Sequence, residues 1–371
     1  MDKIVKFIDL DVPITKCNLR CHYCYVITNE VRDTEETVFK YSASHIGKAL
    51  TQERLGGVCH FNMCGHGETL IPKEIPEITK EILMNGHYVM IVTNGLLTNR
   101  LEEMIQFPAE LRKRLGFKFS FHYLELLRLN LLEKFFENIR KVRAAGMSIS
   151  IEMTPSDELI PHIEDVKSLM MKEFGALCHL TVPRDGNKGD IKLLSKYTLE
   201  EYAEIWKDFD SELFRFKMST WGIRRCEFCY AGAWSGLLNL GDGEMYSCYG
   251  SKKHVNVFKN INRPIKFRAV GKHCSQPHCY NSHSFLSFGL IPDMGELPCY
   301  AQMRDRVDNE GHWLTPEMSD TMSQKLYNNN ELFTEKQIKQ TEKEYKIAEM
   351  KAFFKKFPDK IKYEIKKRRK K

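Results

Sequence analysis

Three cysteines near the start of the chain, Cys17, Cys21 and Cys24, form the pattern CxxxCxxC. A structural zinc site and an ordinary iron-sulfur cluster each use four protein ligands. A compact group of three therefore either lacks a partner or leaves one metal position open. Three thiolates at these spacings can bind three irons of a [4Fe-4S] cluster from one loop, and the fourth iron then takes a ligand from outside the protein.

The elements that must position these cysteines are predicted by hydrophobic patterning. Short β-rich runs alternate with longer helical patterns, which is typical of βα units around a parallel sheet. Six strands are expected at 6–14, 58–64, 87–93, 116–122, 147–154 and 177–183, and helices near 37–55, 73–85, 98–106, 124–145 and 158–174.

Six βα units are fewer than the eight that close a full barrel. We therefore predict an α/β fold, a partial and laterally open (β/α)6 TIM-like barrel. In such sheets, functional residues follow the carboxyl ends of the strands. The three cysteines directly follow the first strand, so they are expected at this edge.

A CxxxCxxC loop after the first strand of a partial parallel barrel resembles the radical S-adenosylmethionine (SAM) superfamily. The resemblance implies that Cys17, Cys21 and Cys24 hold a [4Fe-4S] cluster whose open iron takes the amino and carboxylate groups of SAM. It also implies an enzyme in which the reduced cluster gives SAM one electron. The resulting 5'-deoxyadenosyl radical abstracts hydrogen from a substrate, and a donor such as flavodoxin or ferredoxin supplies the electron.

Polar residues after later strands fit this resemblance. Gly65, His66, Gly67 and Glu68 resemble the family's glycine-glycine-glutamate motif, although His66 replaces the commoner glycine. Glycines let a backbone approach a ligand closely, and free carbonyls there can accept from an ammonium group. The remaining SAM-binding candidates are Thr93, Asn94, Ser120, His122, Glu152 and Arg184, the last as a partner of the carboxylate.

Each of these residues also has a simpler interpretation. Polar residues at strand ends are often solvated caps, and Gly65, Gly67 and Gly95 are also typical of turns. Cys59, Cys64 and Cys178 lie in apolar runs and are expected to be small buried core residues.

A second cysteine group extends from Cys226 to Cys299. The run from Cys229 through Gly243 to Cys248 resembles the opening of the SPASM and twitch extensions, which carry auxiliary iron-sulfur clusters in radical SAM enzymes. The later cysteine run of a full SPASM domain is absent, which favours one auxiliary cluster over two. Its expected ligands are Cys229, Cys248, Cys279 and Cys299, with Cys226 and Cys274 as surplus or substitutes. The rival is a zinc site, because Cys226 with Cys229 and Cys274 with Cys279 also suit tetrahedral thiolate coordination.

The formal charge of +7 is unevenly distributed. Residues 351–371 hold eleven Lys or Arg and two acids, so residues 1–350 carry −2 and nucleic-acid binding by the body is disfavoured. Phe353, Phe357, Ile361 and Ile365 recur among the tail lysines and could form a basic amphipathic helix on anionic lipid, which Pro358 would interrupt. A solvated tail is the simpler alternative, and RNA contact is a third.

The domain prediction is a barrel at 1–190, a bridging helix at 191–220, a cysteine-rich iron-sulfur domain at 221–310, and a helical region with the basic tail at 311–371. Neither a signal peptide nor an apolar run of membrane-spanning length is recognisable, so a cytoplasmic protein is expected.

A peptide or protein is the first substrate expectation, because SPASM-like relatives often modify peptides. Only sixteen residues precede Cys17, which leaves no room for the leader-binding domain of many such enzymes. A carbohydrate or glycoconjugate is the second expectation. The alternative of another class is a non-catalytic zinc-binding module. No catalytic base can be named from the sequence.

Overall fold

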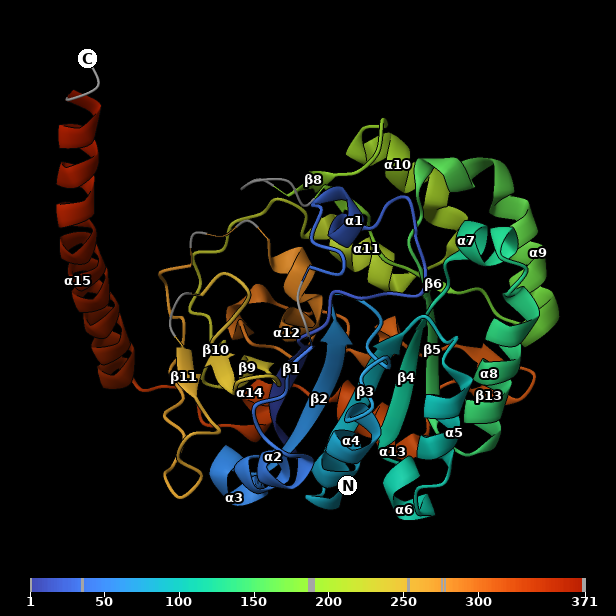
Figure 1. Cartoon of the computed structure of the whole chain (residues 1–371), viewed down its shortest axis with the longest axis horizontal. Helices are drawn as coiled ribbons and strands as arrows, with labels where there is room; N and C mark the ends of the chain where they lie inside the picture. Colours follow the sequence, from blue (N-terminus) through green and yellow to red (C-terminus); the bar gives the residue numbers. More distant parts are fainter. Residues whose placement is uncertain are drawn as a thin grey trace.

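The computed structural model is built on a nine-stranded sheet in the order β11-β10-β9-β1-β2-β3-β4-β5-β6 (Figure 1). It describes residues 2–34, 37–185, 191–251, 254–274, 276 and 278–368, with the backbone alone at 281 and 355–368. The sheet strands are β1 Ile4–Val12, β2 Val58–Gly65, β3 Tyr88–Thr93, β4 Leu115–Ser120, β5 Ser148–Met153, β6 His179–Leu180, β9 Ser235–Asn239, β10 Glu244–Tyr246 and β11 His254–Asn256. Two small hairpins add β7 Arg184–Asp185 with β8 Lys192–Leu193, and β12 Val307–Asp308 with β13 Gly311–His312.

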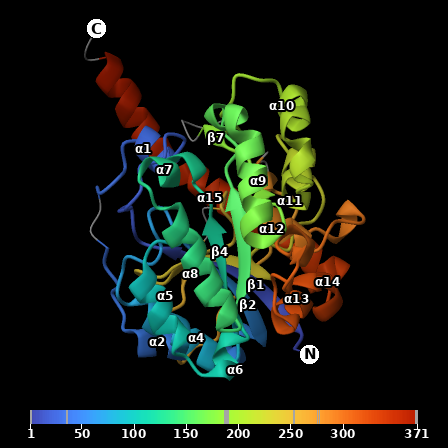
Figure 2. The same cartoon turned by 90° about the vertical axis from the view of Figure 1, so that its right-hand side faces the viewer.

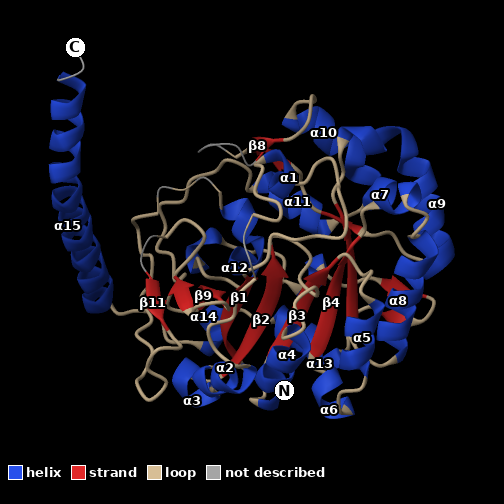
Figure 3. Cartoon of the chain, in the orientation of Figure 1, coloured by secondary structure: helices blue, strands red, loops and turns tan. Residues whose placement is uncertain are grey.

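Helices follow the strands of the first half and dominate the end of the chain (Figure 3). In the first half they are α1 Tyr25–Thr28, α2 Ala43–Ala49, α3 Gln52–Leu55, α4 Ile75–Met84, α5 Thr98–Ile105, α6 Ala109–Arg112, α7 Tyr123–Arg128, α8 Leu132–Ala144, η1 Asp157–His162 and α9 Ile163–Phe174. The remainder are α10 Leu199–Trp206, η2 Lys207–Phe209, α11 Glu212–Ser219, η3 Cys279–Ser282, α12 His283–Ser287, η4 Pro292–Met294, η5 Ala301–Met303, α13 Pro316–Ser323, α14 Leu326–Asn329 and α15 Glu335–Arg368.

The central part of the sheet is parallel, as predicted. Strands β1 to β6 pair in sequence order, each parallel to the next, so their carboxyl ends share one edge. The expected sixth strand at 177–183 shrinks to His179–Leu180. Two expected helices are divided: α2 and α3 replace 37–55, and a left-handed Asn130 (φ 56°) separates α7 from α8.

The cysteine-rich segment joins this sheet, which the sequence did not predict. Strand β9 pairs in parallel with β1, from Phe7 with Ser235 to Asp11 with Asn239. Strands β10 and β11 then extend the sheet in antiparallel fashion. The division at 190, 220 and 310 stays a prediction, because the shared sheet does not fix domain boundaries.

Different parts of the chain cover the two faces of the sheet. Alternating side chains of β1 point to opposite faces, as strand geometry requires: Ile8 and Leu10 pack in the core shared with the helices of the first half, whereas Phe7 packs in a second core. There Phe7 contacts Phe285, Phe288 and Tyr300 of the C-terminal segment. Residues 285–300, part of what is called here the C-terminal segment (residues 279–330), therefore cover the face of the sheet to which Phe7 points.

The C-terminal helix α15 extends beyond the rest of the molecule (Figures 1 and 2). Its bounds pass Pro358, so the expected interruption there is wrong at the backbone level. Phe353 is 61% exposed, whereas the side chains of Phe357, Ile361 and Ile365 lie outside the described residues. No helix in the described parts of the chain is long and apolar enough to cross a membrane. Residues 186–190, at the predicted end of the barrel, fall outside the described residues.

Candidate functional site

The three leading cysteines lie on one loop between β1 and α1. The Cys24 amide donates to the Cys21 carbonyl at 3.1 Å, and Cys24 is the N-cap residue of α1. Arg32 closes the loop from the other side, because its guanidinium donates to the carbonyls of Cys17 and Leu19. Burial is the main cause that raises the pKa of the Cys17 and Cys21 thiols, and the neighbouring thiols raise both further. The loop thus holds three thiols close enough to influence one another, a donor set that fits a three-thiolate cluster site.

The motif after β2 supports the cysteine loop directly. The Gly67 amide donates to the Ile14 carbonyl at 2.7 Å, and the Glu68 amide donates to the Lys16 carbonyl at 2.9 Å. A Cβ on Gly67 would collide with the Lys16 carbonyl. Glycine is therefore needed at position 67 because the cysteine loop passes directly over it.

Glu68 fixes the next turn through its side chain. Its carboxylate is buried and accepts hydrogen bonds from Thr93 Oγ1 at 2.7 Å and from the Asn94 amide at 2.7 Å. The Leu70 amide donates to the same carboxylate at 3.1 Å. Burial raises the pKa of Glu68, and these hydrogen bonds act in the opposite direction. Glu68 is therefore a positioning residue for the turn after β3.

Asn94 connects that turn to the cysteine loop. Its Nδ2 donates to Asn18 Oδ1 at 2.6 Å and lies 3.9 Å from the Cys17 sulfur. The cysteine loop, the Gly65–Glu68 motif and the turn after β3 therefore form one hydrogen-bonded unit, as expected for strand ends that share an edge.

A pocket of about 290 Å³ lies against this unit at the carboxyl edge of the parallel strands. All three leading cysteines line it. Every predicted SAM-binding residue except Glu152 also lines it: Gly65, His66, Gly67, Glu68, Thr93, Asn94, Ser120, His122 and Arg184. Arg184 stacks over the Tyr25 ring with its Cζ 5.4 Å from the ring centroid. The pocket therefore gathers residues from five strand ends around the three thiols.

Glu152 is not among the residues that line the pocket, and it forms a partly buried ion pair with Arg304. Burial opposes ionisation of Glu152, but Arg304, Lys118 and Lys217 together hold its pKa at about 2. Arg304 is fully buried and also contacts His283 Nε2 at 2.6 Å. The expectation that Glu152 faces SAM does not match this position, because its charge is already paired with the C-terminal segment.

The sequence reasoning missed several pocket residues, chiefly Lys217. This lysine on α11 is buried, lines the pocket, and donates from Nζ to Thr181 Oγ1 at 2.7 Å. Burial lowers its pKa to about 7. A signal was available, since Lys217 follows the buried Leu213 by four residues and so shares its helix face. Tyr23 was also missed; its hydroxyl and His122 Nδ1 share a hydrogen bond of 2.6 Å.

The second cysteine group is assembled from separate segments. Burial raises the pKa of Cys229, and the thiols of Cys248, Cys279 and Cys274 reinforce the shift. Burial, reinforced by the thiols of Cys274 and Cys248, likewise raises the pKa of Cys279 to about 12. Cys229, Cys248, Cys274 and Cys279, here called the four-thiol site, thus lie near one another.

Two other cysteines of this group are not among the thiols that raise the pKa of Cys229 or Cys279. The Cys299 sulfur lies 3.8 Å from Ser323 Oγ. Burial lowers the pKa of Lys325, and Cys299 acts in the opposite direction. Cys226 is exposed. Cys274, and not Cys299, is among the thiols that raise the pKa of Cys229, and the expected ligand set of Cys229, Cys248, Cys279 and Cys299 stays a prediction. In the described ranges, no three His, Cys, Asp or Glu side chains converge to hold a metal ion.

The cysteines expected in the core differ from one another. Cys59 and Cys178 are buried as predicted. Cys64 is half-buried and lines the pocket beside Gly65. Cys64 is not among the groups that shift the pKa of Cys17 or Cys21.

Comparison with solved structures identifies the fold. The structure of Streptococcus suis SuiB bound to S-adenosylmethionine matches with a TM-score of 0.50 and 14% identity, covering 70% of this chain and 65% of SuiB. SuiB bound to its precursor peptide SuiA matches with a TM-score of 0.50 and 14% identity, covering 70% of this chain and 63% of SuiB. The chain thus spans just under two thirds of the length of this relative.

Comparison by sequence gives complementary results. The curated proteins contain no match to the chain. The family model described as the radical SAM superfamily matches residues 12–170, which include the cysteine loop and the strand ends from β2 to β5. Residues 12–170 of this chain are therefore a radical SAM superfamily domain.

Proposed function

We propose that the protein is a radical SAM enzyme that reductively cleaves SAM and uses the 5'-deoxyadenosyl radical to abstract hydrogen from a peptide or protein. The observation that carries this proposal is that Cys17, Cys21 and Cys24 all line one pocket at the carboxyl edge of the sheet. A [4Fe-4S] cluster held by these three thiols would supply the electron for SAM cleavage.

The chain's own residues would hold and orient SAM in this pocket. Backbone groups of Gly65 to Gly67 border the thiols and could accept from the SAM ammonium. Arg184 and Lys217 also line the pocket and would provide positive charge for the SAM carboxylate, while Ser120 offers a hydroxyl. Buried apolar neighbours exclude water from the pocket walls, which protects a radical from side reactions.

A peptide is the favoured substrate. The SuiB structure with precursor peptide SuiA supports this choice, because that protein shares the fold and binds a peptide. A carbohydrate or glycoconjugate remains the alternative substrate with the same chemistry. Mass spectrometry of candidate peptides and oligosaccharides after incubation with the reduced enzyme and SAM distinguishes the two, because only the true substrate is consumed.

We further propose that the four-thiol site holds an auxiliary iron-sulfur cluster through Cys229, Cys248, Cys274 and Cys279. Burial, reinforced by neighbouring thiols, raises the pKa of Cys229, Cys248 and Cys279, so these groups need a cation to become thiolates, and either iron or zinc meets this need. Iron is favoured by the resemblance of the Cys229 to Cys248 spacing to a SPASM or twitch opening. Zinc remains the alternative at this site.

Incubation of reconstituted protein with SAM and dithionite tests the main proposal. An enzyme of this class should release methionine and 5'-deoxyadenosine even without substrate. A zinc-binding module should release neither, and that result would reject the proposal. The matched control is Cys59→Ala, which removes a buried thiol from outside the pocket.

Iron and zinc counts in a Cys17→Ala/Cys21→Ala/Cys24→Ala variant test the second site. Residual iron with an iron-sulfur absorption band supports an auxiliary cluster. Zinc with no iron would show that the four-thiol site is a structural zinc site, and the first proposal would still stand.

A further inference from the structure

The C-terminal helix α15 changes in charge along its length. Residues 335–349, here called the neutral part, contain four Lys and four Glu. Residues 350–371, here called the basic part, contain eleven Lys or Arg and two acids, so their formal charge is +9. The helical backbone continues from the neutral part into the basic part as far as Arg368. One continuous helix therefore joins a neutral part to a strongly basic one.

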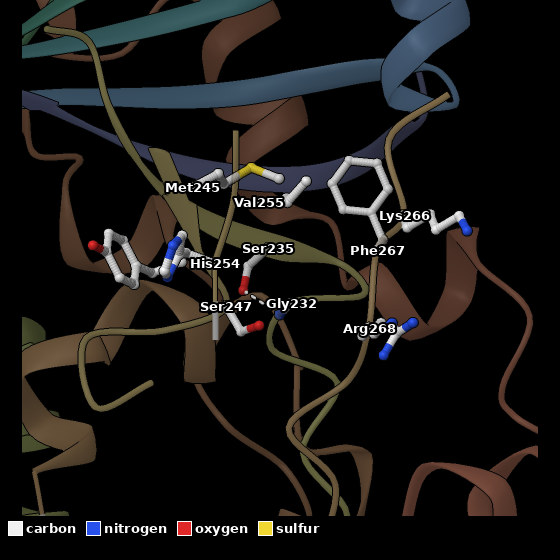
Figure 4. A pocket seen from close by; sticks show the side chains of 10 residues that line it. Gly232, Ser235, Met245, Ser247, His254, Val255, Lys266, Phe267 and Arg268 are labelled. Carbon is white, nitrogen blue, oxygen red and sulfur yellow. Dashed lines mark hydrogen bonds between the residues drawn. The ribbon is translucent and has the colours of Figure 1, made fainter. Parts of the chain in front are cut away.

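The neutral part is attached to the body of the molecule. Ile338 and Tyr345 pack against the second core, and the Tyr345 ring stacks on His273 with 5.0 Å between the ring centroids. Glu344 pairs with Arg268 at 3.0 Å. Figure 4 shows Arg268 at the edge of a pocket of about 510 Å³ that residues of β10 and β11 help to line. These contacts fix where α15 leaves the body, and its C-terminal end lies beyond the rest of the molecule (Figures 1 and 2).

The basic part begins with exposed apolar side chains. Met350, Phe353 and Phe354 are 55%, 61% and 69% exposed. The two phenylalanine rings contact each other edge to face, with 5.9 Å between their centroids. Neighbouring exposed apolar side chains mark an interaction surface more strongly than scattered ones do. The start of the basic part therefore suits a partner that can bury apolar groups.

Apolar positions continue this surface along one side of the helix. At about 100° per residue, the following seven positions fall within an arc of about 120°: Ile347, Met350, Phe353, Phe354, Phe357, Ile361 and Ile365. Of the eight Lys and Arg positions between 351 and 368, seven lie outside this arc, and Arg368 and Glu364 lie within it. The helix thus has one apolar side, here called the apolar arc, and is basic around the remainder.

We propose that the basic part of α15 docks on an anionic lipid surface. The apolar arc would lie at the boundary between the headgroups and the acyl chains, where burial of apolar groups stabilises a surface helix. The cations on both sides of the arc would lie among the negatively charged headgroups, which attract Lys and Arg. This inference is independent of the proposed function, because it involves neither the cysteines nor SAM.

A lipid surface fits this helix better than a nucleic acid or a second copy of the chain. A nucleic acid would use the cations, but Met350, Ile361 and Ile365 have no aromatic face on which a base can stack. A second copy would bring another basic part of charge +9 against the first, and like charges repel. Both occupants are therefore outcomes of the test below.

The test is co-sedimentation of the full-length protein with lipid vesicles, without SAM or reductant. One set of vesicles consists of phosphatidylcholine, and the other is an equimolar mixture of phosphatidylcholine and phosphatidylserine. The protein should bind the mixed vesicles and not the neutral ones. Binding should weaken as the salt concentration rises, because salt screens the attraction between the helix and the headgroups.

The variant Met350→Gln/Phe353→Gln/Phe354→Gln removes exposed apolar groups and leaves the charge unchanged. Glutamine is a good helix former, so the helix should be retained. The affinity for mixed vesicles should fall by about tenfold or more, because the apolar contribution to binding is lost.

The matched control is Met84→Gln/Leu127→Gln/Met171→Gln. It removes exposed apolar groups from α4, α7 and α9, which belong to the body. Its affinity for mixed vesicles should equal that of wild type.

A second variant changes only the charge. Lys355→Gln/Lys356→Gln/Lys360→Gln/Lys362→Gln keeps every residue of the apolar arc and lowers the formal charge of the basic part. Its affinity for mixed vesicles should also fall, and the dependence of binding on salt should become weaker.

Equal affinity for neutral and mixed vesicles, or an unchanged affinity in either α15 variant, would overturn the proposal. If the vesicles are not bound, binding of a generic single-stranded RNA would assign the basic part to nucleic acid instead. A dimer that Met350→Gln/Phe353→Gln/Phe354→Gln abolishes, again without vesicle binding, would assign the apolar arc to a second copy of the chain. SAM cleavage does not enter this test, so failure here leaves the proposed function standing.

Discussion

The two cysteine groups of this chain differ in how far apart their members lie in the sequence. Cys17, Cys21 and Cys24 come from one loop, and the supporting contacts from Gly67 and Asn94 come from neighbouring strand ends. The four-thiol site instead collects residues up to fifty positions apart along the chain. A local site can be recognised from its spacing, whereas a dispersed site depends on the fold that assembles it.

Removal of the leading thiols should have the largest effect. We expect Cys17→Ala/Cys21→Ala/Cys24→Ala to reduce SAM cleavage to the background rate, because no other three thiols line the SAM pocket. Quantifying 5'-deoxyadenosine by chromatography measures this. SAM cleavage that persists in the variant would contradict the assignment of Cys17, Cys21 and Cys24 as cluster ligands.

Single substitutions in the second cysteine group should show whether Cys274 or Cys299 is a ligand of the four-thiol site. Cys274→Ala should lower the iron content by about four atoms per chain if the four-thiol site holds a cubane cluster. Cys299→Ala should leave the iron content unchanged, because Cys299 contacts Ser323 rather than the other thiols. Iron analysis of both variants checks the prediction, and the reverse pattern would restore the ligand set expected from the sequence.

The ion pair of Glu152 and Arg304, in which Arg304 is fully buried and Glu152 partly buried, joins the end of β5 to the segment that follows η5. Glu152→Gln should lower the free energy of unfolding by about 3–5 kcal/mol, because it leaves the fully buried Arg304 without its counter-charge. Denaturant unfolding measures this loss. The double variant Glu152→Gln/Arg304→Met should recover part of it, and an additive loss would argue against a specific pair.

The smallest expected effect concerns Lys217, which lines the same pocket as Cys17, Cys21 and Cys24. Lys217→Met should weaken SAM binding by about tenfold if its ammonium pairs with the SAM carboxylate. Its pKa of about 7 means that the ammonium is present below pH 7 and is lost as the pH rises above it. Wild-type affinity for SAM should therefore fall between about pH 6 and pH 8.

Equilibrium binding across this pH range measures the effect. The affinity of the Lys217→Met variant for SAM should not change with pH in this range. Arg184→Met should weaken SAM binding but keep the pH dependence, since a guanidinium does not titrate there. If the affinity of Lys217→Met for SAM still falls as the pH rises, another group causes the pH dependence.

Patterning predicted most of the parallel sheet. Strands β1 to β5 lie within a few residues of their expected ranges, because buried parallel strands are marked by continuous apolar runs. Strand β9 could not be recognised as part of the sheet, since its five residues pair with β1 more than two hundred positions away. Short strands carry little local signal, and their pairing is decided by tertiary contacts.

Spacing and periodicity within short windows were enough to predict the cysteine loop, the parallel strands and the polar residues at their carboxyl ends. The fold was needed to show that Glu152 pairs with Arg304, that Lys217 lines the pocket, and that Cys274 lies among the thiols that raise the pKa of Cys229. Those outcomes depend on which distant segments share the interior, and burial of a charge or thiol is settled by its neighbours in space rather than by its neighbours in sequence.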